Sequence, residues 1–424
     1  MKKFFKSIVA FTIGIFARAV IHKYHPQIVM VTGSVGKTST KDAVAEVLGT
    51  RFFVRSSEKS FNSEFGVPFT ILGVENPWRN PIAWFEIIKN ALVLLILPNH
   101  YPNMLVLEIG ADKPGDMARI LKIATPNMVV VTRLPDVSVH VEAYASPEAV
   151  QEEEFSPAYA LAPEAPLIVP SDDPYAFDNA IRTNARVFCY GTTPNSSVHV
   201  SEVNFYEEKE KVVGMHAHMN TKGGRGKLVV KGSVGTTQIL PAAAAVAAGI
   251  ALDIPIHESL KALEDYTPPP GRGRILEGKN GSIIIDDSYN ASPAAVEEAL
   301  ATLKAFPHAH RRVAVLGDML ELGRYSVLEH ERIGALADKS ADVIVAVGIR
   351  ARAFTAAPKS VEVMSFDNSF TAASTLPALV REGDVILVKG SQSIRMERIV
   401  EALLADRSDA TKLVRQEEKW KQKV

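Results

Sequence analysis

A short glycine-containing segment, Thr32-Gly-Ser-Val-Gly-Lys-Thr38, has the residue types that bind phosphate groups. It follows an apolar stretch typical of a buried strand and precedes a stretch typical of a helix. Glycines let backbone N–H groups approach phosphate oxygens, and a helix N-terminus adds partial positive charge. Lys37 would contact the β- and γ-phosphates, and the Thr38 hydroxyl would bind Mg²⁺. The segment predicts a nucleotide site. Val31 stands where the general phosphate-loop pattern has glycine, and a plain glycine-rich turn is the alternative.

Other polar side chains also follow apolar runs. Glu108 comes directly after 104–107, and Lys389 comes directly after 385–388. Side chains at the carboxyl ends of parallel strands face the ligand crevice of an open α/β sheet. Glu108 is therefore a candidate Mg²⁺ ligand, with a solvated strand-end acid as the alternative. Lys389 is a candidate for a similar crevice, or a lysine that extends from the core to solvent.

Strand-like and helix-like segments alternate along the chain, which favours a parallel sheet covered by helices on both faces. Before residue 266 the strands are predicted at 28–31, 104–107 and 128–131, and the helices at 37–48, 116–123 and 241–252. Period-two alternation between 198 and 230 predicts a small antiparallel insertion. Beyond a proline-rich segment the alternation resumes, with strands near 283–285, 313–316, 343–347 and 385–388.

We therefore predict an α/β fold: a P-loop-type parallel-sheet ATPase domain with a small β insertion, followed by a Rossmann-like C-terminal domain. Its predicted parts are an N-terminal helix (1–27), a central ATP-binding domain (28–265), a hinge (266–274), a C-terminal domain (275–406) and a charged, frayed tail (407–424).

Composition excludes several classes of protein. The 424 residues are 47% hydrophobic, which is enough for buried cores in two to three domains. The 47 Lys and Arg against 48 Asp and Glu give a net charge of −1, which argues against a protein that coats nucleic acid. A single cysteine excludes a disulfide framework and fits a reducing compartment. We expect a cytoplasmic monomer without a nucleic-acid partner.

Two apolar segments bear on membrane contact. Residues 7–21 follow Lys2, Lys3 and Lys6 as in a signal peptide, but Arg18 interrupts the run and no small-residue cleavage site follows it. We predict an amphipathic or core-docking helix, with weak membrane-surface contact as the alternative. The run 91–97 is too short to span a bilayer and is predicted to be the buried end of a helix.

Six motifs, taken in order, resemble the Mur ligase family of ATP-dependent amide-bond-forming enzymes. They are Asn62-Ser-Glu-Phe-Gly-Val-Pro68, Glu108-Ile-Gly-Ala-Asp-Lys-Pro-Gly-Asp116, His140-Val-Glu142, Asp286-Asp-Ser-Tyr-Asn-Ala-Ser-Pro293, Leu316-Gly-Asp-Met-Leu-Glu-Leu-Gly323 and Lys389-Gly-Ser391. The resemblance extends from about residue 28 to about residue 404. The family's phosphate loop has the shorter form Thr-Gly-x-x-Gly-Lys-Thr, which accounts for Val31.

The resemblance implies a ligase with ATP and Mg²⁺ as cofactors. A carboxylate of a UDP-MurNAc-peptide-like acceptor would take the γ-phosphoryl group of ATP and form an acyl phosphate. The amine of D-alanyl-D-alanine would then attack, and phosphate would leave, as a step of peptidoglycan precursor synthesis. Lysine and Mg²⁺ would neutralise the charge of two anions that must approach each other.

The resemblance also implies roles for individual residues. Catalysis is assigned to Lys37, Glu108, His140 and Arg272, with Arg274 as a competing candidate for the hinge arginine. ATP contacts are assigned to Gly33, Ser34, Val35, Gly36, Lys37, Thr38, Gln238, Arg272 and Asp287. Metal contacts are assigned to Thr38, Glu108 and His140; without the family, His140 would be read as an ordinary surface or core residue. Substrate contacts are assigned to Asn62, Glu64, Asn290, Asp318, Glu321, His330 and Lys389.

The sequence departs from the family pattern at several positions. A carbamylated lysine is expected about fourteen residues after the metal histidine, where this chain has Glu154. We expect Glu154 to replace it as a metal ligand, with a solvated acidic helix face as the alternative. Gln238 and Pro241 stand in the adenine-side segment where histidine and asparagines are usual, and Arg133 stands where asparagine is expected. Only 27 residues precede the first predicted strand, where the family has a UDP-binding domain.

Three other functions stay open at this point. The first is a folylpolyglutamate-synthase-like amino acid ligase, which the motifs at 286–290 and 317–323 disfavour. The second is a P-loop ATPase that forms no amide bond, which the complete second α/β block disfavours. The third is a nucleotide-binding relative without catalysis, which Glu154 and the short N-terminal segment suggest.

Overall fold

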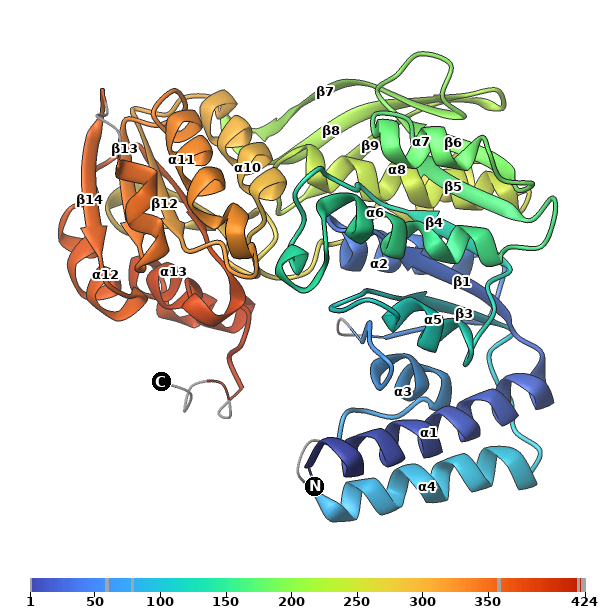
Figure 1. The fold of residues 1–424 in the computed structure, drawn as a ribbon. Helices are drawn as coiled ribbons and strands as arrows, with labels where there is room; N and C mark the ends of the chain where they lie inside the picture. The colour runs from blue at the N-terminus through green and yellow to red at the C-terminus, as the bar shows by residue number, and fades with distance from the viewer. Residues whose placement is uncertain (1, 58–60, 78–79, 357–359, 418–419, 421–424) are drawn as a thin grey trace.

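The structure is a computed structural model that describes residues 2–57, 61–77, 80–356, 360–417 and 420, with the side chains of 2–8 and 81 left out. Two α/β units lie side by side, each built around its own sheet (Figure 1). The α/β fold predicted from strand-helix alternation is confirmed.

The first unit contains a nine-stranded sheet of order β2-β3-β1-β4-β5-β6-β7-β8-β9. Its strands are β1 (Gln27–Thr32), β2 (Val54–Ser56), β3 (Met104–Glu108), β4 (Met128–Val131), β5 (Pro166–Pro170), β6 (Arg186–Gly191), β7 (Val198–Glu208), β8 (Lys211–Thr221) and β9 (Gly224–Lys231). All pairings from β2 to β7 are parallel, and β7, β8 and β9 pair antiparallel. The predicted antiparallel insertion therefore extends the main sheet rather than forming a separate one.

Helices cover both faces of this sheet. They are α1 (Lys2–Tyr24), α2 (Lys37–Gly49), α3 (Gly66–Leu72), α4 (Pro81–Ile96), α5 (Asp116–Leu121), α6 (Pro147–Phe155), α7 (Pro174–Ala180), α8 (Thr236–Ala251) and α9 (Ile256–Ala262). On one face, α2 and the alanine-rich α8 pack on Val29, Val31 and Val106. On the other face, α1, α3, α4, α5 and α7 share a core with Met30, Leu105 and Leu107.

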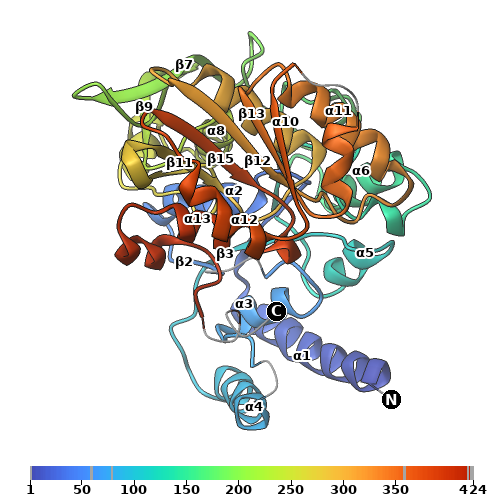
Figure 2. The same cartoon turned by 90° about the vertical axis from the view of Figure 1, so that its left-hand side faces the viewer.

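The second unit contains a six-stranded sheet of order β10-β11-β15-β12-β13-β14 (Figure 2). Its strands are β10 (Arg274–Glu277), β11 (Ile283–Asp287), β12 (Arg311–Gly317), β13 (Val343–Val347), β14 (Glu362–Phe366) and β15 (Asp384–Lys389). Its helices are α10 (Pro293–Ala305), α11 (Ser326–Ala337), α12 (Ser369–Thr375) and α13 (Glu397–Leu403). The edge strand β10 is antiparallel, and the other strands are parallel.

The structure tests the expectations for the N-terminal helix, for 91–97 and for the tail. The N-terminal helix is present as α1, which buries Ile13, Ala17 and Val20 against its neighbours. The expectation for 91–97 was wrong in part: α4 buries Ala91 and Leu94 but exposes Leu92 and Ile96, because the helix has one packed face only. The tail is not frayed throughout, because Leu413 and Arg415 are buried against the second unit. Within the described residues, no helix is both long and apolar enough to cross a bilayer.

Candidate active site between the two units

The phosphate loop connects β1 to α2, as predicted. Gly33 and Gly36 have φ angles of 116° and 85°, a region that glycine enters without steric cost. A Cβ atom at Gly33 would lie 2.4 Å from Thr132 Oγ1, so close packing also requires glycine there. The backbone N–H of Ser34 donates to the carbonyl of Arg133 (2.9 Å), which fixes the loop against the residues after β4.

Lys37 and Glu154 form an ion pair at this loop. The Lys37 ammonium donates to the carbonyl of Gly33 and lies 3.6 Å from Glu154 Oε1. The other carboxylate oxygen of Glu154 accepts from the Ser34 hydroxyl, which lies 2.8 Å from the hydroxyl of Ser138. Glu154 is buried on α6, so it is not on the solvated acidic face considered as the alternative.

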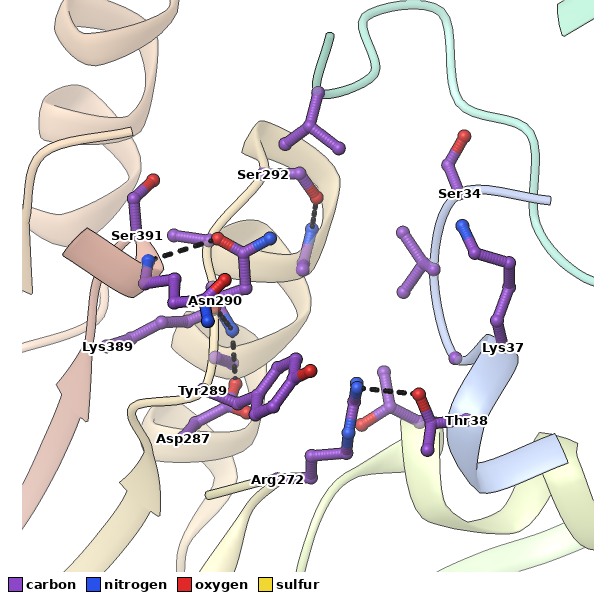
Figure 3. A pocket seen from close by; sticks show the side chains of 18 of the residues that line it. Ser34, Lys37, Thr38, Arg272, Asp287, Tyr289, Asn290, Ser292, Lys389 and Ser391 are labelled. Carbon is purple, nitrogen blue, oxygen red and sulfur yellow. Dashed lines mark hydrogen bonds and ion pairs between the residues drawn. The ribbon is translucent and has the colours of Figure 1, made fainter. Parts of the chain in front are cut away.

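A cavity of about 780 Å³ separates the phosphate loop from the second unit. Figure 3 shows Ser34, Lys37 and Thr38 on one side, facing Asp287, Asn290, Lys389 and Ser391 on the other. Its walls bring together most of the residues predicted for the site: Ser34, Val35, Gly36, Lys37, Thr38, Asn62, Glu108, His140, Gln238, Arg272, Asp287, Asn290, Glu321 and Lys389. Segments more than 200 residues apart in sequence thus face one space.

The second unit contributes a network at the ends of β11 and β15. Lys389 donates to Asp287 Oδ2 (2.6 Å) and to the carbonyl of Asn290 (3.0 Å). Lys389 is buried, so its ammonium is paired within the protein rather than extended to solvent. This pairing fixes the Asp287 carboxylate at the cavity wall.

Arg272, from the segment predicted to be the hinge, contacts both units. Arg272 donates to the hydroxyl of Thr38 (3.0 Å), and its guanidinium stacks 4.4 Å from the ring centre of Tyr289. Arg274, the competing candidate, instead donates to the carbonyl of Lys412 at the surface. The geometry therefore favours Arg272 for contact with bound phosphate.

His140 also bridges the units. Its Nδ1 lies 2.8 Å from Glu321 Oε2, and its Nε2 lies 3.5 Å from Asp112 Oδ1. Burial opposes the charged imidazole, but the hydrogen bond and charge of Glu321 outweigh it and raise the pKa of His140.

The backbones of His140 and Glu321 both adopt the left-handed conformation, with φ angles of 68° and 64°. This conformation is energetically costly for non-glycine residues, and such residues are concentrated at functional sites.

Arg133, one of the departures from the family pattern, forms a second bridge. Its guanidinium pairs with Glu298 on α10, so the two units are also linked on this side of the cavity. Burial raises the pKa of Glu298, although the charge of Arg133 opposes that shift.

Several predicted residues do not line the cavity. Two of them are Gly33 of the phosphate loop and Glu154 of α6. Glu64 is a third, and it pairs with Arg119 (3.1 Å).

Asp318 and His330 bind backbone groups of the second unit instead of lining the cavity. Asp318 accepts from the backbone N–H of Ala351 (2.7 Å). His330 is fully buried: its Nε2 accepts from the N–H of Met319 (3.0 Å), and its Nδ1 donates to the carbonyl of Ser326 (2.6 Å). His330 and Asp318 thus hold the loop that carries Glu321.

Sequence reasoning missed other residues that line the cavity. Asp112 lies within the motif that begins at Glu108, and an acidic side chain so close to a strand end could have indicated a place at the cavity. Arg395 and Trp420 also line it, and no local pattern marks them. Trp420 comes from the tail, where its carbonyl accepts from Arg395 Nη1 (2.6 Å).

The residues present fit Mg²⁺ and ATP. Thr38 and Glu108 offer a hydroxyl and a carboxylate to the same cavity, and Mg²⁺ prefers oxygen ligands. Gln238 Oε1 is buried without a hydrogen-bond partner among the described residues, which suits an amine donor such as that of adenine. Among the described residues, however, no three His, Cys, Asp or Glu side chains already form a metal-binding cluster.

Comparison with known proteins places this arrangement in a family. Residues 31–249 match the Mur ligase middle domain, and residues 271–392 match the Mur ligase, glutamate ligase domain. The chain belongs to the Mur ligase family. As a Mur ligase it is an ATP-dependent ligase with ATP and Mg²⁺ as cofactors, and these two predictions are confirmed.

Similar proteins cover most of this Mur ligase. The UDP-N-acetylmuramoyl-tripeptide–D-alanyl-D-alanine ligase of Mycobacterium leprae is 30% identical over 409 residues, covering 89% of this chain and 74% of the relative. The enzyme of the same name from Bacillus subtilis is 28% identical over 394 residues, covering 92% and 78%. The crystal structure of MurF ligase from Thermotoga maritima in complex with ADP has a TM-score of 0.76 and 25% identity, covering 93% and 83%.

Proposed function

We propose that this Mur ligase joins D-alanyl-D-alanine to the carboxylate of a UDP-MurNAc-peptide-like acceptor in peptidoglycan precursor synthesis. The names of its relatives in Mycobacterium leprae and Bacillus subtilis support this choice of substrates. Because the reaction consumes ATP, we propose that it takes place in the cytoplasm.

The proposal rests on the residues that form the two walls of the cavity. The cavity has the phosphate loop on one wall and the paired Asp287 and Lys389 on the other, and Arg272 connects the two through Thr38. A ligase must hold a triphosphate, a carboxylate and an amine within reach of one another. A cavity between two units can do this, because each unit binds different parts of the reactants.

The cavity residues would have separate roles in phosphoryl transfer and in metal binding. Lys37 and Arg272 would neutralise the γ-phosphoryl group while an acceptor carboxylate oxygen attacks its phosphorus and ADP leaves. The amine of D-alanyl-D-alanine then attacks the acyl carbon, loses a proton, and displaces phosphate. Mg²⁺ would supply further charge neutralisation, with Thr38, Glu108 and His140 as its proposed ligands.

A coupled assay tests the proposed reaction. Protein, ATP and Mg²⁺ are mixed with D-alanyl-D-alanine and the UDP-MurNAc-tripeptide, and phosphate release is measured. We expect release only with both substrates, and a loss of about 100-fold or more in Lys37→Ala because a phosphate contact is removed. Lys122→Ala, an exposed lysine outside the cavity, is the control. Release that needs neither substrate would instead indicate a plain ATPase.

We also propose that Glu154 provides the carboxylate that the family obtains from a carbamylated lysine. Its buried side chain contacts Ser34 and lies 3.6 Å from Lys37, so a negative charge is held directly at the phosphate loop. A glutamate needs no carbon dioxide for this charge, whereas a lysine does.

The Glu154 proposal predicts altered metal binding. In Glu154→Gln, the Mg²⁺ concentration needed for binding a non-hydrolysable ATP analogue should rise by roughly tenfold or more, because a charged metal ligand becomes neutral. Isothermal calorimetry at several Mg²⁺ concentrations measures this. Glu152→Gln, an exposed acid on the same helix, should behave as the wild type. An unchanged Mg²⁺ requirement in Glu154→Gln would show that Glu154 only positions the loop.

A further inference from the structure

Two helices at one end of the molecule expose an apolar surface. The exposed side chains include Phe11 and Ile15 of α1 and Ile82, Phe85, Leu92 and Ile96 of α4, which together we call the apolar patch. Phe85 and Ile96 are 70% and 72% exposed, and Phe11 is 66% exposed. In Figure 1, α1 and α4 lie at the end of the first unit that is farthest from β14 and α12.

Most of the apolar patch lies on α4, which is a capped helix with one packed face. On α4, Ile82, Phe85, Leu92 and Ile96 recur at helical spacing on one face, while Ile87, Ala91 and Leu94 of the opposite face are buried. Asn80 caps the helix start by accepting from the N–H of Ile82 (3.0 Å). The exposure therefore does not result from a poorly formed helix.

The end of α4 is fixed to α1. Lys23 donates to the carbonyls of Leu94 (2.8 Å), Leu95 (3.0 Å) and Leu97 (2.9 Å), and the Tyr24 hydroxyl donates to Leu94 (2.7 Å). A cation at these otherwise unpaired carbonyls stabilises a helix C-terminus. The two helices thus form one rigid layer with apolar side chains facing outward.

The same layer is strongly basic. Together α1 and α4 contain six Lys or Arg (Lys2, Lys3, Lys6, Arg18, Lys23 and Lys89) and a single acid, Glu86, which gives a formal charge of +5. The whole chain has a net charge of −1, so the rest of the molecule is acidic. Apolar side chains beside Lys and Arg are typical of helices that lie in the interface of an anionic bilayer.

We propose that α1 and α4 dock this ligase on an anionic lipid bilayer. The apolar patch would insert among the lipids, and the exposed Arg18 and Lys89 would contact the headgroups. A second copy of the chain is a poorer occupant, because a symmetric dimer would place one +5 layer against another. None of the residues that line the active-site cavity comes from α1 or α4, so docking leaves the proposed reaction unobstructed. The inference does not depend on the identity of the substrates.

Sedimentation with lipid vesicles tests the proposal. The wild-type protein should bind vesicles of equal parts phosphatidylglycerol and phosphatidylcholine, more weakly in high salt, and should bind pure phosphatidylcholine poorly. The double variant Phe85→Ser, Ile96→Ser should bind the anionic vesicles on the order of tenfold more weakly, since two large apolar side chains no longer leave water.

A matched control keeps the result specific. Ile349→Ser, Phe370→Ser changes two exposed apolar residues of the second unit and should bind vesicles as the wild type does. Circular dichroism verifies that both variants are folded. Equal binding by both double variants, or no wild-type binding to anionic vesicles, would overturn the proposal. So would light scattering that shows a wild-type dimer which Phe85→Ser, Ile96→Ser converts to a monomer without any vesicle binding.

Discussion

Asp286 shows how burial sets the charge of a single residue beside the cavity. It lies in β11 next to Asp287, and its Oδ1 accepts from the backbone N–H of Ser288 (3.1 Å). Burial raises the pKa of Asp286 to about 6 from 3.8, despite the hydrogen bonds of Ser288, which lower it. The folded protein therefore binds the proton more tightly than the unfolded chain does, and the free energy of unfolding falls as pH rises from 3.8 to about 6.

Asp286→Asn should remove this pH dependence, because the amide stays neutral and its oxygen can still accept from Ser288. Relative to the wild type, the variant should gain up to about 3 kcal/mol of unfolding free energy between about pH 4 and pH 7. Urea unfolding at several pH values measures the difference. Asp178→Asn, an exposed control, should follow the wild-type curve. Parallel curves for Asp286→Asn and the wild type would mean that Asp286 is ionised without cost.

The sequence predicts the place of a residue where that place depends on neighbouring residues. Lys37 and Glu108 line the cavity as expected, because a glycine-rich loop and a strand end can both be recognised from adjacent residues. The pairing of His140 with Glu321 joins residues 181 positions apart, and it depends on how the two units meet. Likewise, nothing near His330 in the sequence shows that both ring nitrogens bond to the protein's own backbone.

At the scale of elements, the C-terminal segment holds part of the candidate site in place. Arg415 donates to Glu397 Oε2 (2.9 Å) and to the carbonyls of Ser288 and Tyr289, which precede Asn290. The Arg415 and Glu397 side chains are both buried. The charge of 407–424 predicted a frayed tail. The sequence does not show that Glu397, which lies on α13, is buried and binds Arg415.

Arg415→Ala should destabilise the protein by about 3 kcal/mol, because the buried Glu397 loses one of its charged partners. It should also weaken ATP binding, since the turn between Asp287 and Asn290 loses its support. Denaturant unfolding and calorimetry measure the two effects. Lys412→Ala, whose side chain is exposed, should change stability by no more than about 0.5 kcal/mol. Similar losses in both variants would contradict the role given to Arg415.

The elements themselves were predicted well where apolar runs mark buried parallel strands, as in β1, β3, β4 and β13. The edge strand β10 was missed, because Arg274–Glu277 has only one buried residue and lies beside the proline-rich segment. The start of α8 at Thr236 was also missed, since Pro241 lies inside the helix and suggested a boundary. The exposure of α4 depends on what covers the helix, which its own residues do not show.

At the scale of the whole molecule, the two units form a connected structure around the cavity. Their cores are continuous where α8 contacts α10, and Arg133–Glu298, His140–Glu321 and Arg272–Thr38 join them across the site. The division at 28–265, 266–274 and 275–406 stays a prediction. Because the proposed substrate contacts come from both units, we expect closing and opening between the units to control access to the site.

Oxygen transfer tests directly whether this cavity activates a carboxylate by phosphorylation. The acceptor carboxylate is labelled with oxygen-18, and the released phosphate is analysed by mass spectrometry after turnover with ATP, Mg²⁺ and D-alanyl-D-alanine. We expect one labelled oxygen in the phosphate, because the oxygen that attacked phosphorus leaves when the amine displaces phosphate. Phosphate whose added oxygen comes from water would show that ATP is hydrolysed without activating the acceptor, and would contradict the proposed acyl-phosphate mechanism.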